Sequence, residues 1–244
     1  LIGTIGWGIA IFLVASSFLI ILPLLFFVSQ ASEKTAPTTE QVNTIQAIKI
    51  AFSDRSYTLL FFGFFVCGFH VQFIGTHLPA YIIDEGLTPI IGAWSLALIG
   101  LFNIAGSFFS GWSGQVYSKP KLLSGIYAFR AAVISAFIFV PLSETSVLIF
   151  SAAMGILWLS TVPLTTGLIA QTQGLKFLST LAGLVFFSHQ VGGFLGAWLG
   201  GRLYDLTGNY EAMWIAAILF GLLATVIHLP IRETAGKLAQ VEFK

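Results

Sequence analysis

The sequence predicts an all-α, polytopic bundle of transmembrane helices, and its composition and the length of its apolar runs both indicate this. Of the 244 residues, 57% are hydrophobic and only 9% are charged, and the mean hydropathy is +0.92, which excludes a water-soluble globular protein. Several apolar runs reach the roughly 20 residues that a helix needs to cross a hydrocarbon core about 30 Å thick. They lack the alternating pattern of barrel strands, so helices are the structure that satisfies their backbone groups in lipid.

Seven stretches meet this length, and a polar, proline-containing segment separates the first from the other six. The predicted spans are residues 2–28, 57–81, 90–112, 122–141, 147–169, 177–201 and 212–229. The chain therefore divides into an N-terminal transmembrane helix (1–28), a linker (29–56), a six-helix bundle (57–230) and a tail (231–244). Because the chain opens with Leu1 inside an apolar run, we expect it to be a fragment of a longer protein.

Local patterns add detail to the linker and the spans. In the linker, apolar residues recur at helical spacing and predict a short helix, lying either on the membrane surface or as a plain connection; they are Val42, Ile45, Ile48 and Phe52.

Pro79 and Pro163 each remove a backbone hydrogen bond and mark places where a span bends. Three glycines recur every four residues and predict a helix face that another backbone approaches closely, for packing or for sliding; they are Gly192, Gly196 and Gly200.

Basic residues in the connections predict how the spans are oriented. Lys and Arg gather in segment 29–56, loop 113–121, turn 170–176 and the C-terminal tail. The connections that alternate with these contain a single basic residue, Arg202. Short connections rich in Lys and Arg stay on the cytoplasmic side of a membrane. We therefore expect the linker and the C-terminus to be cytoplasmic.

Arg130 is the one fixed positive charge near the middle of a predicted span, and all ten Asp and Glu residues fall in loops, tails or span ends. A charge at this depth is costly and is by default a functional-site hypothesis. Its guanidinium could bind a carboxylate of a substrate or of a missing part of the protein. Alternatively, it could extend to the membrane surface, or it could be held by backbone carbonyls or by a polar neighbour such as Asn103 or Ser107.

Several motifs resemble those of the major facilitator superfamily. In loop 111–121, Gly111, Lys119 and Lys121 match the family's loop motif, but Gln115 and Val116 stand where an acid and an arginine are usual. Residues 193–210 are similar to the end of the penultimate helix in monocarboxylate-porter-like bacterial members; they read Gly193-Phe194-Leu195-Gly196-Ala197-Trp198-Leu199-Gly200-Gly201-Arg202-Leu203-Tyr204-Asp205-Leu206-Thr207-Gly208-Asn209-Tyr210. The same branch is indicated by Gly68-Phe69-His70 and Thr76-His77-Leu78-Pro79-Ala80-Tyr81.

The resemblance implies that the seven spans are the last helix of the first half and the whole six-helix second half of a twelve-helix carrier. The implied function is secondary active transport by alternating access of a small organic solute, a monocarboxylate-like anion, with proton symport as an option. The implied partners are the missing N-terminal half and the lipid bilayer, and the implied location is the bacterial inner membrane. The alternative is a non-transporting membrane sensor or scaffold on the same fold.

Carriers of this kind bind substrate near the bilayer midplane, so polar and aromatic residues at the span midpoints are the candidates for substrate binding or coupling. They are His70, Asn103, Arg130, Trp158, His189 and, beside it, Gln190. The resemblance implies that the spans bearing His70, Asn103, Trp158 and His189 line a cavity, whereas that bearing Arg130 is peripheral. With no carboxylate in the spans, proton coupling within this half would have to use histidine.

Each candidate also has a purely structural interpretation. A histidine inside a span can be hydrogen-bonded to a neighbouring helix, and a tryptophan in the middle of a helix can serve packing alone. The sequence contains no metal-ligand cluster, no phosphate-binding loop and no nucleophile paired with a base, so we expect neither a cofactor nor a metal, and no enzymatic activity. No nucleic-acid partner is expected either.

Overall fold

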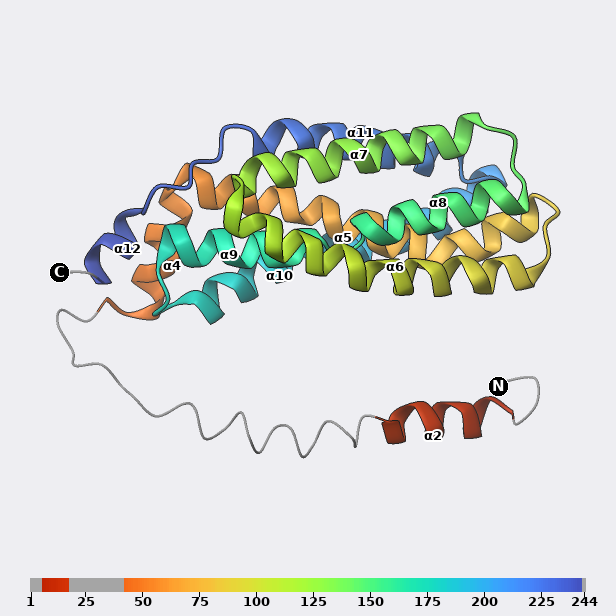
Figure 1. Ribbon diagram of the computed structural model, residues 1–244, viewed down its shortest axis with the longest axis horizontal. Helices are drawn as coiled ribbons and strands as arrows, with labels where there is room; N and C mark the ends of the chain where they lie inside the picture. Colours follow the sequence, from red (N-terminus) through yellow and green to blue (C-terminus); the bar gives the residue numbers. More distant parts are fainter. Residues whose placement is uncertain (1–5, 18–41, 243–244) are drawn as a thin grey trace. The chain divides into compact units, whose positions relative to one another are not determined.

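A computed structural model of the chain describes residues 6–17 and 42–242, and all the regular structure in these ranges is helical (Figure 1). The chain forms two units, one before residue 42 and one from residue 42 onward. In the first unit, the structure describes helix α2 (Trp7–Ser17), on which Ile9, Ile11 and Phe12 are exposed. The rest of the predicted span 2–28 lies outside the described residues.

The second unit confirms the other six predicted spans, because it contains six helical elements that are long and apolar enough to cross a membrane. They are α5 (Arg55–Asp84), α6 (Pro89–Val116), α7 (Lys119–Phe139), the pair α8 (Glu144–Leu157) and α9 (Thr161–Gln173), α10 (Leu178–Thr207) and α11 (Glu211–His228). Most of them extend past the predicted bounds, since a helix continues beyond its apolar part. In Figure 1, α7 and α11 run side by side, and the two helices pack directly.

The span predicted at 147–169 is interrupted where the chain passes from α8 to α9, through residues 158–160. Pro163 explains the interruption, because it has no N–H for the carbonyl of Leu159 and its ring crowds that carbonyl. The Leu159 oxygen instead accepts a hydrogen bond from the N–H of Val162, at 2.9 Å. The predicted bend at Pro163 is therefore confirmed and is a complete break, whereas Pro79 lies inside the continuous helix α5.

The glycine face predicted on α10 packs against α5. A methyl group on Gly192 or Gly196 would collide with backbone atoms of α5, at Phe65 and Phe69 respectively, and one on Gly200 would collide with the His77 ring. On the other helix, Gly68 faces the backbone at His189 in the same way. The predicted close approach of two backbones is confirmed, and it fixes α5 against α10 along most of the bundle.

Two shorter helices lie at one end of the bundle. Helix α4 (Thr44–Ser53) confirms the helix predicted in the linker; Asn43 caps it, its side chain accepting from the N–H of Gln46 at 2.9 Å. It buries Ala47 and Ala51, and Ile48 and Ile50 pack partly against the same core, while Ile45 is 67% exposed. After α11 the chain runs along this end to helix α12 (Lys237–Glu242), which contacts α4 and α9 (Figure 1).

Candidate functional site

The break between α8 and α9 leaves carbonyl oxygens without their usual helical donors, and Arg130 of α7 binds two of them. Its Nε and Nη2 donate to the Leu157 oxygen at 3.2 and 2.6 Å, and Nη2 also donates to the Trp158 oxygen. The side chain is 0% exposed, so it does not extend to the membrane surface. Of the interpretations open from the sequence, the structure shows capture by backbone carbonyls.

Helix α6 supplies further hydrogen bonds to backbone groups at the break. The Asn103 Oδ1 accepts a hydrogen bond from the N–H of Leu159 at 3.0 Å and another from the hydroxyl of Ser107 at 3.2 Å. The hydroxyl of Ser110 donates to the Ser160 oxygen. Buried backbone groups that lose their helical partners need such replacements, and α6 and α7 together supply them at the break.

Trp158 packs against α5, and His70 is a residue of that helix. The half-buried Trp158 ring packs beside Gly75 of α5. His70 is 0% exposed, and its Nε2 lies 2.7 Å from the Ala217 oxygen of α11; since a carbonyl only accepts, this nitrogen donates. The His70 ring is therefore buried against the neighbouring helix α11, which agrees with the structural interpretation of a histidine inside a span, and its place in a cavity stays a prediction.

His189 and Gln190 of α10 lie in a groove between α5 and α10. The groove has a volume of about 440 Å³ and is lined by Gln72, His189, Gln190, Gly193, Phe194, Ala197 and Trp198. The His189 Nδ1 lies 3.1 Å from the Gln190 Oε1, an amide oxygen that accepts its hydrogen. The His189 ring also lies 5.1 Å from the Phe64 ring, measured between centroids. Phe194 and Trp198 are stacked, with ring centroids 6.1 Å apart.

A buried thiol connects the groove to the helix break. The Cys67 Sγ lies 3.2 Å from the Oγ1 of Thr161, the first residue of α9. The same thiol is close enough to His189 and Arg130 to interact electrostatically with both. The break and the groove, whose Phe194 and Trp198 side chains are exposed, are therefore neighbours on either side of this buried thiol.

The structure thus brings three candidates, Asn103, Arg130 and Trp158, to the break and two others, His189 and Gln190, to the groove. Sequence reasoning missed Gln72, Phe194 and Trp198 as groove residues. For Phe194 and Trp198 the sequence does contain a usable pattern, because the lining residues of α10 from Gln190 to Trp198 recur at helical spacing and so share one face of the helix. Within residues 6–17 and 42–242, no three His, Cys, Asp or Glu side chains gather closely enough to hold a metal ion.

These features define the class of protein: a polytopic integral membrane protein whose helix bundle contains a polar groove and a broken span. A model of the Major Facilitator Superfamily matches residues 1–197. The chain belongs to this superfamily.

The chain is similar to several curated proteins. It is 28% identical over 181 residues to the uncharacterized MFS-type transporter YcxA of Bacillus subtilis (strain 168), covering 72% of this chain and 44% of that protein. It is 30% identical over 168 residues to monocarboxylate transporter 13 of Rattus norvegicus, covering 66% and 39% respectively. A match to monocarboxylate transporter 11 of Mus musculus is 24% identical and covers 94% of this chain and 53% of the relative. The chain spans less than half the length of the first two relatives.

Proposed function

We propose that the chain is part of a secondary active transporter that moves a small organic anion of the monocarboxylate type by alternating access. The observation that carries the proposal is the groove between α5 and α10, because it brings polar side chains and apolar rings together inside the membrane-spanning part. Two relatives named as monocarboxylate transporters support the substrate class. Family membership supports the mode of action.

The groove contains groups suited to each part of such an anion. Amide N–H groups of Gln72 and Gln190 are donors that can bind a carboxylate, and the Nε2 of His189 becomes one when the ring is protonated. Phe194 and Trp198 are 64% and 53% exposed, and their stacked rings offer an apolar wall for the hydrocarbon part. Because His189 is the titratable side chain in this lining, we propose it as the group that carries the proton if transport is proton-coupled.

The residues at the break have a different role in the proposal. Arg130, Asn103 and Trp158 act as positioning residues that hold α8 and α9 in a defined relative geometry, and His70 positions α5 against α11. A broken helix whose freed backbone groups are bonded by neighbouring helices is a place where two half-helices can change their angle. We propose that this break moves during alternating access.

The proposal also covers the surroundings of the bundle. Helices α6 and α10 expose large apolar side chains, including Ile104, Phe108 and Phe187. We propose that these faces meet lipid and the N-terminal half of the same carrier. The linker 29–56 and the tail 231–244 then lie in the cytoplasm, and the membrane is the bacterial inner membrane.

The test is uptake by proteoliposomes that contain the full-length protein. Labelled monocarboxylates, dicarboxylates and neutral solutes are compared with and without an inward proton gradient, for the wild type and His189→Ala, with Arg202→Gln as an exposed control outside the groove. The proposal expects monocarboxylate uptake that His189→Ala lowers by at least about tenfold, the loss of one charge-assisted contact, and that the control leaves unchanged. Absence of uptake for every solute would favour the non-transporting sensor or scaffold.

A further inference from the structure

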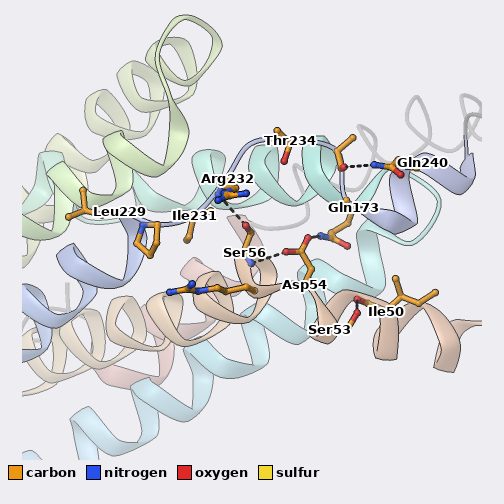
Figure 2. Close-up of a pocket in the computed structure, with 14 residues that line it drawn as sticks. Ile50, Ser53, Asp54, Ser56, Gln173, Leu229, Ile231, Arg232, Thr234 and Gln240 are labelled. Carbon is orange, nitrogen blue, oxygen red and sulfur yellow. Dashed lines mark hydrogen bonds between the residues drawn. The ribbon is translucent and has the colours of Figure 1, made fainter.

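A second and larger cavity lies at the end of the bundle that carries α4 and α12, away from the groove. Its volume is about 820 Å³, and it is enclosed by the junction of α4 and α5, the end of α9, the end of α11 and the segment that leads to α12 (Figure 2). Every one of these elements contributes side chains to the lining. The transport proposal makes no use of this cavity.

Specific hydrogen bonds build the wall of this cavity. The Asp54 carboxylate accepts from the N–H of Ser56 at 2.8 Å and from the Gln173 amide at 2.9 Å, which joins α5 to α9 (Figure 2). The backbone N–H of Arg232 donates to the Ser56 hydroxyl at 3.1 Å, and the N–H of Gly236 donates to the Thr172 oxygen at 2.7 Å. Three segments far apart in the sequence are therefore fixed around one space.

The cavity carries an excess of positive charge. Arg55 and Arg232 both line it and both are exposed, and neither makes an ion pair with any residue that the structure describes. Asp54 is the acidic residue in the lining, and both of its oxygens already accept hydrogen bonds. The nearby Glu233 is turned to Lys119, 3.8 Å away. The lining therefore has two guanidinium groups and one carboxylate that already accepts two hydrogen bonds, and this balance favours an anionic ligand.

The lining also has an apolar side. Leu229 and Pro230 follow the end of the membrane-spanning helix α11, and Leu229 is 61% exposed. Arginine presents a planar fork of donors that matches the oxygens of a phosphate. A ligand that offers phosphate oxygens to the arginines and hydrocarbon to Leu229 is a membrane phospholipid. Basic pockets between transmembrane helices on the cytoplasmic side bind anionic headgroups.

We propose that this cavity binds the phosphate headgroup of an anionic phospholipid through Arg55 and Arg232. The phosphate chemistry is shared by inorganic phosphate, but the apolar side of the lining and its position at the end of a span favour the lipid. The site is independent of the groove and of the transported solute. Its occupant would connect α5 to the C-terminal segment through the two arginines.

Binding to the purified full-length protein in detergent tests the proposal, by calorimetric titration with three probes: short-chain phosphatidylglycerol, short-chain phosphatidylcholine and inorganic phosphate. The variants are Arg55→Gln, Arg232→Gln and the double variant. Lys121→Gln is the matched control, because it removes one exposed charge from the first turn of α7 without touching this lining. Phosphatidylglycerol is expected to bind more tightly than either other probe.

Each single variant is expected to weaken phosphatidylglycerol binding by about fivefold and the double variant by about 25-fold, since one basic residue near a lipid surface contributes about 1 kcal/mol. The ratio of phosphatidylglycerol to phosphatidylcholine affinity within each variant does not depend on the fraction that is folded. Equal binding of the two lipids by the wild type would overturn the proposal, as would an equal loss in Lys121→Gln. Inorganic phosphate binding as tightly as phosphatidylglycerol would overturn the lipid assignment.

Discussion

The guanidinium of Arg130 donates to the Leu157 carbonyl at 2.6 Å and so takes the place of a backbone donor that the helix break removes. In an unbroken helix, the Leu157 and Trp158 oxygens would accept from the N–H groups of Thr161 and Val162. Here Val162 bonds to Leu159 instead. The buried charge and the broken span therefore depend on each other.

This dependence predicts a coupling between Arg130 and Pro163. Arg130→Gln is expected to lower the free energy of unfolding by about 2–4 kcal/mol, because it removes charge-assisted hydrogen bonds and leaves buried carbonyls unsatisfied. Pro163→Ala restores an N–H and lets the helix run on, so the two carbonyls regain backbone donors. In the Pro163→Ala background, Arg130→Gln should cost at least about 1 kcal/mol less. Unfolding of the four proteins in detergent measures the cycle, and strict additivity would contradict the coupling.

Asn103 is predicted to act through its acceptor oxygen alone. Asn103→Asp keeps an oxygen for the N–H of Leu159, whereas Asn103→Leu keeps the approximate shape and leaves this N–H without a partner. Asn103→Leu should therefore lower the free energy of unfolding by roughly 1–3 kcal/mol, and Asn103→Asp should lower it by less. Thermal unfolding followed by tryptophan fluorescence compares the two, and a larger loss in the aspartate variant would show that the amide group matters instead.

The close approach of α5 and α10 predicts a contrast between two glycines of the same helix. A Cβ at Gly196 would lie 2.5 Å from the Phe69 oxygen, whereas one at Gly183 would meet nothing within 4 Å. Gly196→Ala is therefore expected to destabilise the protein by about 1–3 kcal/mol through overpacking. Gly183→Ala should be neutral or stabilising by up to about 1 kcal/mol. Equal unfolding midpoints for the two variants would contradict the packing of these helices.

Glu233 is predicted to fasten the C-terminal segment to the bundle. Its Oε1 accepts from the N–H of Lys119 at 3.0 Å, and its carbonyl accepts from the Gln171 amide at 3.2 Å. The pair with Lys119 is partly exposed, so Glu233→Ala should change global stability by less than about 1 kcal/mol. Hydrogen exchange of segment 232–236 should nevertheless become faster. Glu85→Ala, an exposed control, should leave this segment unchanged, and unaltered exchange in Glu233→Ala would refute the fastening role.

Much of the fold follows from the sequence for simple physical reasons. Six spans follow from apolar length, and the break follows from Pro163, because both depend on local chemistry alone. The glycine contact of α10 was predictable from the spacing of Gly192, Gly196 and Gly200. The helix that these glycines approach could not be predicted, since a stripe of small residues does not identify its partner helix.

The directions of individual side chains were harder to predict. His70 lies on a helix that is apolar on most sides, so the sequence gives no polar face that would show whether the ring meets a cavity or a neighbour. The structure turns it to Ala217. For Arg130 the sequence left several partners open. Its actual partners are carbonyls that become free only because another span is broken, and the geometry of that break cannot be read from the sequence around Arg130. Gln72 was missed because its role depends on α10, which lies more than 100 residues further along the chain.

The most direct test of the central claim is substrate protection of a single cysteine in the groove of the full-length protein. Ala197→Cys places a thiol in the lining between Gly193 and Trp198, while the native Cys67 is buried and Gly183→Cys serves as a control on the same helix. We predict that a transported monocarboxylate slows maleimide labelling at position 197 and leaves labelling at position 183 unchanged. Equal labelling rates with and without the solute at position 197, in protein that still transports it, would contradict the assignment of the groove as the substrate site.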